Sequence, residues 1–288
     1  MFDRVYIEIS NVCNLQCSFC PEVLRPKKLM EIEPFQSILS QIKPYARAVT
    51  LHVMGEPLAH PLFPHFLEKL EQAQIPLLLT TNGLLLSRHQ ATLLKHASII
   101  KQINFSVHSF FDNFPSKDIT NYLSQLIEFS YAFTKTNPES FINFRLWNLQ
   151  SSQQNNNIPI FSFLQDRFPS PQLPSQVNVR EQKSYRLDRH IKLHFDTQFE
   201  WPTLNSKANE SHGFCYGLQN QLAILTEGTV VPCCLDKEGV INLGSLFETP
   251  LEKILQSPRA QAIIQGFKKN QSTETLCQKC QYKQRFNT

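Results

Sequence analysis

The 288-residue sequence has no long apolar run. No stretch approaches the roughly 18 consecutive apolar residues that a membrane-spanning helix requires. The first ten residues also lack an apolar export segment, because Val5, Ile7 and Ile9 alternate with polar residues as they would in a strand. These two absences predict a cytoplasmic protein without a membrane partner, in a reducing compartment where disulfides are rare.

The sequence has little excess charge of either sign. Its net charge of +4 lies in residues 268–288, and the remaining residues are balanced. A short basic segment is typical of a solvated surface, or of the surroundings of a negatively charged cluster. The charge pattern therefore argues against a nucleic-acid partner.

Segments with the spacing of strands alternate with segments that have the spacing of helices. This alternation predicts an α/β fold, with a parallel sheet that is either open or curled into a barrel. Six strands are expected at Val5–Ser10, Val49–Met54, Pro76–Thr81, Ile103–Val107, Phe141–Leu146 and Ile191–Phe195. Helices are expected between several of them, at Phe35–Tyr45, Pro64–Ala73, Arg88–His96 and Ile119–Phe133.

The pattern becomes weaker after the fifth predicted strand. The polar segment Asn148–Asn157 predicts a loop, followed by a helix near Pro159–Phe168. Pro169, Pro171 and Pro174 then predict irregular chain as far as Ile191. Cys-rich sequence replaces the alternating pattern after Trp201-Pro202, so two domains are expected, residues 1–200 and 201–288.

Polar residues follow four successive predicted strands. A three-cysteine segment follows the first strand, Gly55-Glu56-Pro57 the second, Thr81-Asn82-Gly83 the third and His108-Ser109 the fourth. Because the carboxyl ends of parallel strands meet at one edge of a sheet or barrel, these residues predict a single active site there.

Cys13, Cys17 and Cys20 place three thiols within eight residues. Thiolates are the soft ligands of iron–sulfur clusters, and a complete protein set has four of them. A set of three would leave one iron open to bind a substrate or cofactor. The alternative is a structural zinc site with His52 or His60 as its fourth ligand.

The motif Cys-x3-Cys-x-aromatic-Cys, with Phe19 as its aromatic residue, resembles the signature of the radical S-adenosylmethionine superfamily. The resemblance implies a partial (β/α)6 barrel similar to a TIM barrel and a four-iron cluster held by the three cysteines. In this family the open iron chelates S-adenosylmethionine, and an electron from the cluster cleaves it to a 5′-deoxyadenosyl radical that abstracts a substrate hydrogen.

The resemblance also implies roles for later motifs. Gly55-Glu56-Pro57 is similar to the family's motif for the ammonium group of the cofactor, and Asn82 and Ser106 match polar positions that hydrogen-bond the cofactor. Arg145 could pair with the cofactor carboxylate. Each has a structural alternative: Glu56 as a helix-start residue, Asn82-Gly83 as a turn, Ser106 as a core hydroxyl and Arg145 as a surface ion-pair partner.

Five further cysteines lie near the C-terminus. Cys277-x2-Cys280, Cys215 and one of the adjacent pair Cys233-Cys234 could supply four thiolates and so close a metal site against substrate. Zinc is an open alternative to iron and sulfide here. The arrangement resembles the SPASM and twitch subgroup, in its single-cluster form, and implies a second four-iron cluster. Its Gly-x4-Cys spacing from Gly228 favours Cys233 over Cys234 as the ligand.

The sequence does not specify a substrate. The resemblance implies a radical enzyme that modifies a peptide or protein side chain or, alternatively, dehydrogenates a small sugar-like alcohol, with an electron donor such as flavodoxin or ferredoxin. An iron–sulfur carrier and a zinc-binding module, both without radical chemistry, remain alternatives from other classes. His108 is the candidate for proton transfer, because histidine titrates near neutrality, and Trp147, Asp196 and Glu200 also lie near predicted strand ends.

Overall fold

The computed structural model describes residues 1–152, 154–168, 177–207 and 210–286. The chain divides into two compact units. Unit 1 contains Met1–Asn14, Pro21–Leu77 and Phe199–Thr288, and unit 2 contains Leu15–Cys20 and Leu78–Gln198. The expected division into domains 1–200 and 201–288 stays a prediction.

The sheet of unit 1 is centred on β1 (Arg4–Ile7), which pairs in parallel with β2 (Val49–Thr50) and with β8 (Gln221–Ile224). The short β9 (Val230–Val231) is antiparallel to β8. Val49 also pairs with Leu77, the first residue of β3 (Leu77–Thr81). Three of the four β1 residues are buried, as expected of a strand with a parallel neighbour on each side.

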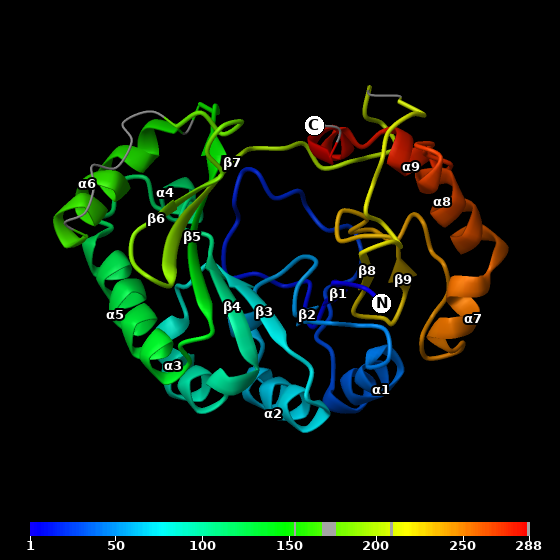
Figure 1. Ribbon diagram of the computed structural model, residues 1–288, viewed down its shortest axis with the longest axis horizontal. Coiled ribbons are helices and arrows are strands. Elements are labelled where there is room, and N and C mark those ends of the chain that lie inside the picture. Colours follow the sequence, from blue (N-terminus) through cyan, green and yellow to red (C-terminus); the bar gives the residue numbers. More distant parts are fainter. Residues whose placement is uncertain (153, 169–176, 208–209, 287–288) are drawn as a thin grey trace. The chain divides into compact units, whose positions relative to one another are not determined.

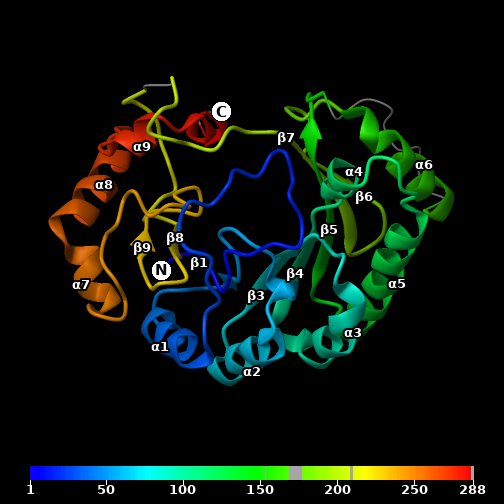
Figure 2. The same cartoon turned by 180° about the vertical axis from the view of Figure 1, so that it is seen from behind.

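The helices of unit 1 pack in sequential pairs. α1 (Ile32–Ile42) contacts α2 (Phe63–Ala73), and α7 (Leu251–Gln256) contacts α8 (Pro258–Lys268). In α1 the buried residues Phe35, Ile38, Leu39 and Ile42 recur at helical spacing. Figures 1 and 2 show α7 and α8 alongside β8 and β9. The remaining helical turns are η1 (Pro57–Ala59), α9 (Thr275–Gln278) and η4 (Gln281–Phe286).

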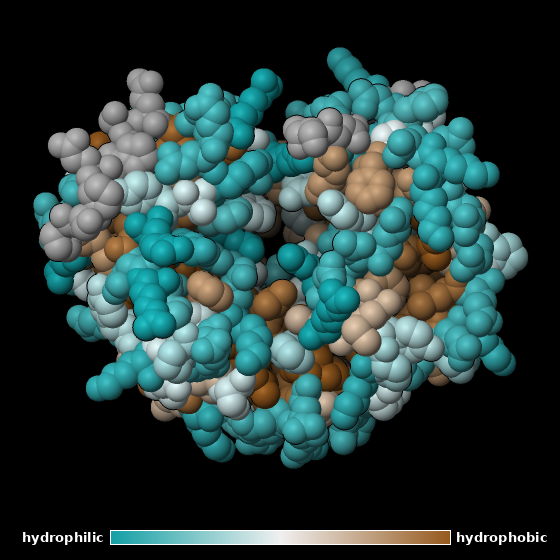
Figure 3. Space-filling model, viewed as in Figure 1, coloured by the Kyte–Doolittle hydropathy of each residue, from teal (hydrophilic) through white to brown (hydrophobic). Residues whose placement is uncertain are grey.

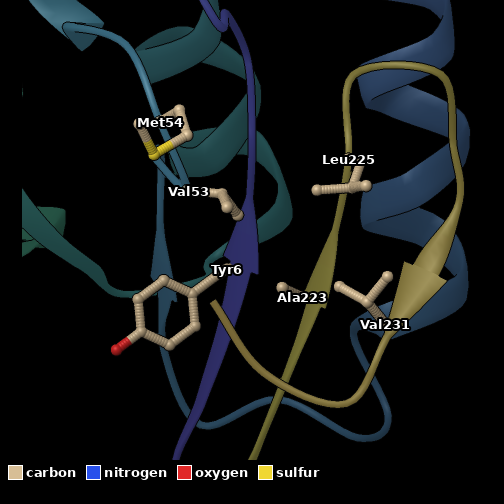
Figure 4. Close-up of a cluster of buried hydrophobic side chains, with 6 residues drawn as sticks. All are labelled: Tyr6, Val53, Met54, Ala223, Leu225 and Val231. Carbon is tan, nitrogen blue, oxygen red and sulfur yellow. The ribbon is translucent and has the colours of Figure 1, made fainter. Parts of the chain in front are cut away.

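A small apolar cluster connects the strands of unit 1. Tyr6 comes from β1, Val53 and Met54 from the segment after β2, Ala223 from β8, Leu225 from its end and Val231 from β9. Figure 4 shows the Tyr6 hydroxyl pointing away from the β8 and β9 side chains. The cluster therefore buries the ring of Tyr6 and directs its polar end elsewhere.

The sheet of unit 2 continues from β3 with parallel strands. β4 (Ile100–Phe105) pairs in parallel with β5 (Phe141–Leu149), and β5 with β7 (Ile191–Thr197). The edge strand β6 (Ser184–Arg186) is antiparallel to β7. The strand order in this unit is β3-β4-β5-β7-β6.

Helices of unit 2 lie on the outer side of β4 and β5 in both views (Figures 1 and 2). α5 (Thr120–Thr136) contacts α3 (Leu86–Lys95) and buries a row of apolar side chains that includes Leu126, Phe129 and Phe133. α4 (Ser109–Asn113) is a short helix that directly follows β4. The others are η2 (Ala97–Ile99), η3 (Gln154–Asn157) and α6 (Ile158–Arg167).

The predicted α/β fold with a mainly parallel sheet is confirmed, and the structure corrects several boundaries. The strand expected at Val49–Met54 ends at Thr50, and the loop expected from Asn148 begins only after β5 ends at Leu149. The segment expected to be irregular up to Ile191 contains β6. Pro169, Pro171 and Pro174 lie outside the described residues.

Among the described residues, no helix combines the length and the apolar character needed to cross a membrane. The face drawn in Figure 3 is mostly hydrophilic, with apolar residues visible in separate patches.

Candidate active site

A buried ion pair lies at the end of β1. The Glu8 side chain is fully buried and accepts two hydrogen bonds from Arg25 Nη2, at 2.7 and 2.9 Å. It also accepts from the backbone N–H of Met54 at 3.2 Å, and from the N–H and hydroxyl of Thr226 at 3.2 and 2.8 Å. These bonds satisfy the buried carboxylate. Glu8 was not predicted as a site residue, because its alternation with apolar neighbours indicates a solvated strand face.

The segment after Cys20 is tied to the segment after Cys234. Arg25 Nε donates to the Lys237 carbonyl at 2.7 Å, and the Glu238 carboxylate accepts from the N–H groups of Leu24 and Arg25 at 3.0 and 3.2 Å. Lys237 Nζ donates to the Glu22 carbonyl at 2.6 Å and also contacts Glu238. Two regions far apart in the sequence, each following predicted cluster ligands, are therefore held together within unit 1.

Gly55 sits where a side chain would not fit. Its φ is +75°, and an added Cβ would lie 2.3 Å from the Ser10 carbonyl oxygen and 2.9 Å from that of Val12. Glu56 N–H donates to the Val12 carbonyl at 3.0 Å. The chain after β2 is thus pressed against the start of the cysteine segment, a close approach that only glycine permits.

Glu56 acts as a helix-start residue in this structure. Its buried side chain accepts a hydrogen bond at 3.0 Å from the N–H of Leu58, in the 3₁₀ turn that begins with Pro57. Glu56 therefore has the structural role that the sequence left open for it, that of a helix-start residue. Its role toward the ammonium group of a cofactor stays a prediction.

The three N-terminal cysteines are distributed over both units. Cys13 belongs to unit 1, whereas Cys17 and Cys20 belong to unit 2 and form a turn in which Cys20 N–H donates to the Cys17 carbonyl at 3.0 Å. Cys13 and Cys20 are exposed and Cys17 is half-buried. None of the eight cysteines, all of which are described, is in a disulfide.

Phe19 and His108 are in ring contact within unit 2, with centroids 4.8 Å apart. His108 Nδ1 lies 3.0 Å from the carbonyl oxygen of Arg145. Because a carbonyl only accepts, Nδ1 carries the proton of the neutral ring. Burial, with a smaller contribution from the nearby Arg145 charge, lowers the pKa of His108 to about 4. An ordinary histidine titrates near neutrality, which is why His108 was predicted as the proton-transfer residue, but in this structure it is neutral at pH 7.

Asn82 and Ser106 lie at the ends of neighbouring strands of unit 2, where Ser106 N–H donates to the Thr81 carbonyl at 2.9 Å. The Asn82 side-chain oxygen accepts from Leu84 N–H at 3.0 Å, and its carbonyl accepts from the Tyr122 hydroxyl at 2.7 Å. Asn82 therefore forms a turn, its structural alternative. Cofactor contacts by these two residues stay predictions.

Arg145 lies beside an aromatic and histidine pair on β5 and β7. Its guanidinium is 4.5 Å from the Trp147 ring centroid, and Trp147 Nε1 donates to His194 Nδ1 at 2.9 Å. Burial and the Arg145 charge lower the pKa of His194 to about 4. His194 was not predicted as a site residue, because pairing across two strands leaves no local signal in the sequence. Pairing of Arg145 with a cofactor carboxylate stays a prediction.

Asp196 follows on β7, where it is buried and accepts from the N–H of Thr197 at 2.8 Å. Glu200 lies outside unit 2, on the segment that begins at Phe199. Their suggested part in proton transfer stays a prediction.

The thiols near the C-terminus lie close enough to influence one another. Burial raises the pKa of Cys233 and of Cys277 well above the ordinary value, and neighbouring thiols add to each shift. For Cys233 these neighbours are Cys234, Cys215, Cys277 and Cys280. Burial, together with Cys280, raises the pKa of Cys215 to about 11. The four predicted ligands, all in unit 1, therefore interact electrostatically, and their role as cluster ligands stays a prediction.

Cys234 has different surroundings from Cys233. The Tyr6 hydroxyl hydrogen-bonds the Cys234 thiol, and Arg4 in turn hydrogen-bonds Tyr6. Burial raises the pKa of Tyr6. Cys234 therefore has a polar partner on β1, and the preference for Cys233 as the ligand stays a prediction.

In the part of the chain that the structure describes, no three His, Cys, Asp or Glu side chains converge closely enough to hold one metal ion. This finding concerns a single shared ion. In a four-iron cluster each thiolate binds a different iron, so its ligands need not converge on one point.

Comparison with known proteins gives two matches to family models. The Radical SAM superfamily model matches residues 7–132, and the SPASM iron–sulfur cluster-binding domain model matches residues 215–281. No curated protein shows significant sequence similarity to the chain.

Several solved structures share the fold. The chain is 14% identical to BtrN in complex with AdoMet and 2-DOIA, with a TM-score of 0.57, and the match covers 98% of this chain and 93% of BtrN. The chain is 19% identical to Streptococcus suis SuiB bound to S-adenosylmethionine, with a TM-score of 0.61, and the match covers 92% of this chain and 68% of SuiB. It is 15% identical to anSMEcpe with bound AdoMet and Cp18Cys peptide, with a TM-score of 0.57, and the match covers 97% of this chain and 86% of anSMEcpe.

The similarity of the chain to these solved structures establishes its partial-barrel fold. The first family implies S-adenosylmethionine and a four-iron cluster, and the second an additional iron–sulfur cluster. The chain therefore contains a radical SAM domain in residues 7–132 and an iron–sulfur cluster-binding SPASM domain in residues 215–281.

Proposed function

We propose that this protein reductively cleaves S-adenosylmethionine and abstracts a hydrogen atom from a peptide or protein side chain. The observation that carries the proposal is the three-thiol segment that follows β1 inside the matched radical SAM region. When bound, S-adenosylmethionine and a reduced cluster supply the 5′-deoxyadenosyl radical. The chain's own residues would bind the clusters and orient S-adenosylmethionine.

The N-terminal thiols fit an iron–sulfur cluster by their chemistry. Cys17 Sγ accepts a hydrogen bond from the Asn113 side chain at 3.2 Å. A sulfur that carries negative charge, as a cluster ligand does, is a better acceptor than a neutral thiol. In this proposal Cys13, Cys17 and Cys20 hold the cluster.

The C-terminal thiols fit a second cluster for an electrostatic reason. Desolvation raises the pKa of all four thiols, and neighbouring thiols raise it further for Cys215, Cys233 and Cys277. The four cannot all ionise without a compensating positive charge, which iron or another metal supplies. In this proposal the ligands are Cys215, Cys233, Cys277 and Cys280. A closed site suits the transfer of an electron from the substrate radical.

The polar residues at the strand ends are proposed to bind S-adenosylmethionine. Gly55, Glu56 and Pro57 would meet its ammonium group, Asn82 and Ser106 would hydrogen-bond it, and Arg145 would pair with its carboxylate. The aromatic Phe19 would line the same site. His108, neutral in the folded protein, can accept a proton from substrate rather than donate one.

Two of the solved neighbours support a peptide substrate. One structure is SuiB bound to the precursor peptide SuiA, and another is anSMEcpe with Cp18Cys peptide. We therefore place a peptide or protein first, with flavodoxin or ferredoxin as the proposed electron donor.

A small sugar-like alcohol is the second candidate. The match to BtrN covers nearly all of both chains, whereas the SuiB match leaves about a third of SuiB without a counterpart here. If this candidate holds, the protein would dehydrogenate an alcohol. Deuterated peptides and deuterated polyols tested in parallel would distinguish the two, because only the true substrate transfers deuterium into 5′-deoxyadenosine.

The test of the central step is an anaerobic assay with dithionite and S-adenosylmethionine, read out as 5′-deoxyadenosine by mass spectrometry. Replacement of Cys13, Cys17 and Cys20 by Ala should abolish the product. Cys234→Ala is the matched control and should retain it. A cluster-loaded wild-type protein that forms no 5′-deoxyadenosine would instead support an iron–sulfur carrier, and a colourless protein that binds zinc would support a zinc-binding module.

A further inference from the structure

We propose that Asn113 is a positioning residue for the N-terminal cluster. Its side chain donates a hydrogen bond to the sulfur of Cys17 and so raises the reduction potential of the cluster. This inference rests on the proposed function, because it assumes a cluster at Cys17. Asn113 lies outside every motif from which site residues were predicted.

The orientation of the Asn113 side chain follows from its two backbone partners. Its Oδ1 accepts from the N–H of Gln16 at 2.9 Å, and its Nδ2 donates to the carbonyl of Ser109 at 2.9 Å. A backbone N–H only donates and a carbonyl only accepts, so the two ends of the amide cannot be exchanged. The second hydrogen of Nδ2 therefore points to Cys17 Sγ, 3.2 Å away.

The neighbouring residue holds the same loop. Both carboxylate oxygens of Asp112 accept from Ser18, one from its N–H at 2.5 Å and the other from its hydroxyl at 2.7 Å. Gln16, Cys17 and Ser18 are thus held by two consecutive residues at the end of α4, the short helix labelled in Figure 1. The loop and the helix both belong to unit 2, so this arrangement is complete within one unit.

The two residues differ in what they offer the cluster. Asp112 contacts the backbone and side chain of Ser18 but donates no proton to sulfur, whereas Asn113 combines a backbone contact with an N–H to a ligand sulfur. A reduced cluster carries one more negative charge than an oxidised cluster, and a donor stabilises the more negative state. Loss of the Asn113 donor should therefore shift the midpoint potential downward.

The test is an anaerobic titration with dithionite, followed by electron paramagnetic resonance, on the full chain with both clusters reconstituted. The signal that changes on addition of S-adenosylmethionine identifies the N-terminal cluster. Asn113→Leu has a similar size but no donor, and Asn113→Asp keeps the acceptor for Gln16 while losing the N–H groups. Both should reduce at a lower potential than wild type.

Ser18→Ala is the matched control, because it removes one bond between α4 and the loop without touching the sulfur. It should keep the wild-type potential. The proposal is overturned if Asn113→Asp or Asn113→Leu, with full iron and sulfide content, titrates like wild type, or if Ser18→Ala shifts as far as they do. A wild-type protein with no signal that responds to S-adenosylmethionine would overturn the proposed function itself.

Discussion

The Glu8 carboxylate joins four segments of unit 1 at one side chain. It is fully buried, and its partners come from the loop after Cys20, the segment after β2 and the end of β8. A buried ion pair is costly to form, but removing one partner leaves the other charge without compensation. Glu8 should therefore contribute more to the stability of the fold than its position in an alternating strand indicates.

Glu8→Gln should lower the free energy of unfolding by about 3 kcal/mol, because Arg25 would lose its buried anionic partner and keep the ion pair with the more exposed Glu227. Urea denaturation followed by circular dichroism measures the change. Asp3→Asn is the control, since it breaks an exposed pair with Arg47 and should cost no more than about 1 kcal/mol. Equal effects of the two substitutions would argue against this account of Glu8.

His60 makes the stability of the folded protein depend on pH. Its Nδ1 accepts from Leu62 N–H at 3.0 Å, and burial lowers its pKa from 6.5 to about 4. The unfolded chain therefore binds more protons between these pH values. The stabilisation is complete above pH 6.5 and is lost as the pH falls toward 4.

The free energy of unfolding of the wild type should accordingly fall by about 3 kcal/mol between neutral pH and pH 4 on account of His60. In His60→Asn this part of the pH dependence should disappear, because the Asn side chain can accept the same N–H without binding a proton. Replacement of the exposed His65 by Asn should leave the pH profile as in wild type. A His60→Asn protein with an unchanged profile would contradict the assignment.

At the scale of elements, long periodic segments were predicted well and short ones were not. α2 and α3 begin and end within two residues of the predicted bounds, because apolar spacing over three turns is a strong local signal. The two-residue β9 and the three-residue β6 were missed. Such strands depend on a neighbouring strand for their hydrogen bonds and leave little periodic pattern.

The loop around Lys237 and Glu238 should control the mobility of the segment after Cys20. Glu238→Ala removes the carboxylate that accepts from Leu24 and Arg25 N–H, so these two amides should exchange with deuterium faster. Hydrogen–deuterium exchange with mass spectrometry reports on the peptide that contains them. Glu252→Ala, on α7, serves as the control and should leave that peptide unchanged, and protection that persists in Glu238→Ala would contradict the prediction.

At the scale of the whole molecule, each of the two cysteine regions should bind one cluster, and the loss of one cluster should leave the other in place. Cys277→Ser with Cys280→Ser should reduce the iron content from about eight to about four atoms per chain, since half of the second ligand set is lost. Iron and sulfide analysis after anaerobic reconstitution measures this. The variant should still form 5′-deoxyadenosine without substrate, and an unchanged iron content would contradict the proposed ligand set.

The order of residues was sufficient to predict the fold class and the family, because motif spacing and apolar periodicity are properties of short segments. The two cysteine ligand sets stay predictions. The order of residues could not show that Asn113 meets Cys17, that Glu8 meets Arg25, or that His108 is kept neutral. Each of these depends on burial or on contacts between segments distant in sequence. Such contacts arise only when the sheet brings the strand ends and their loops together.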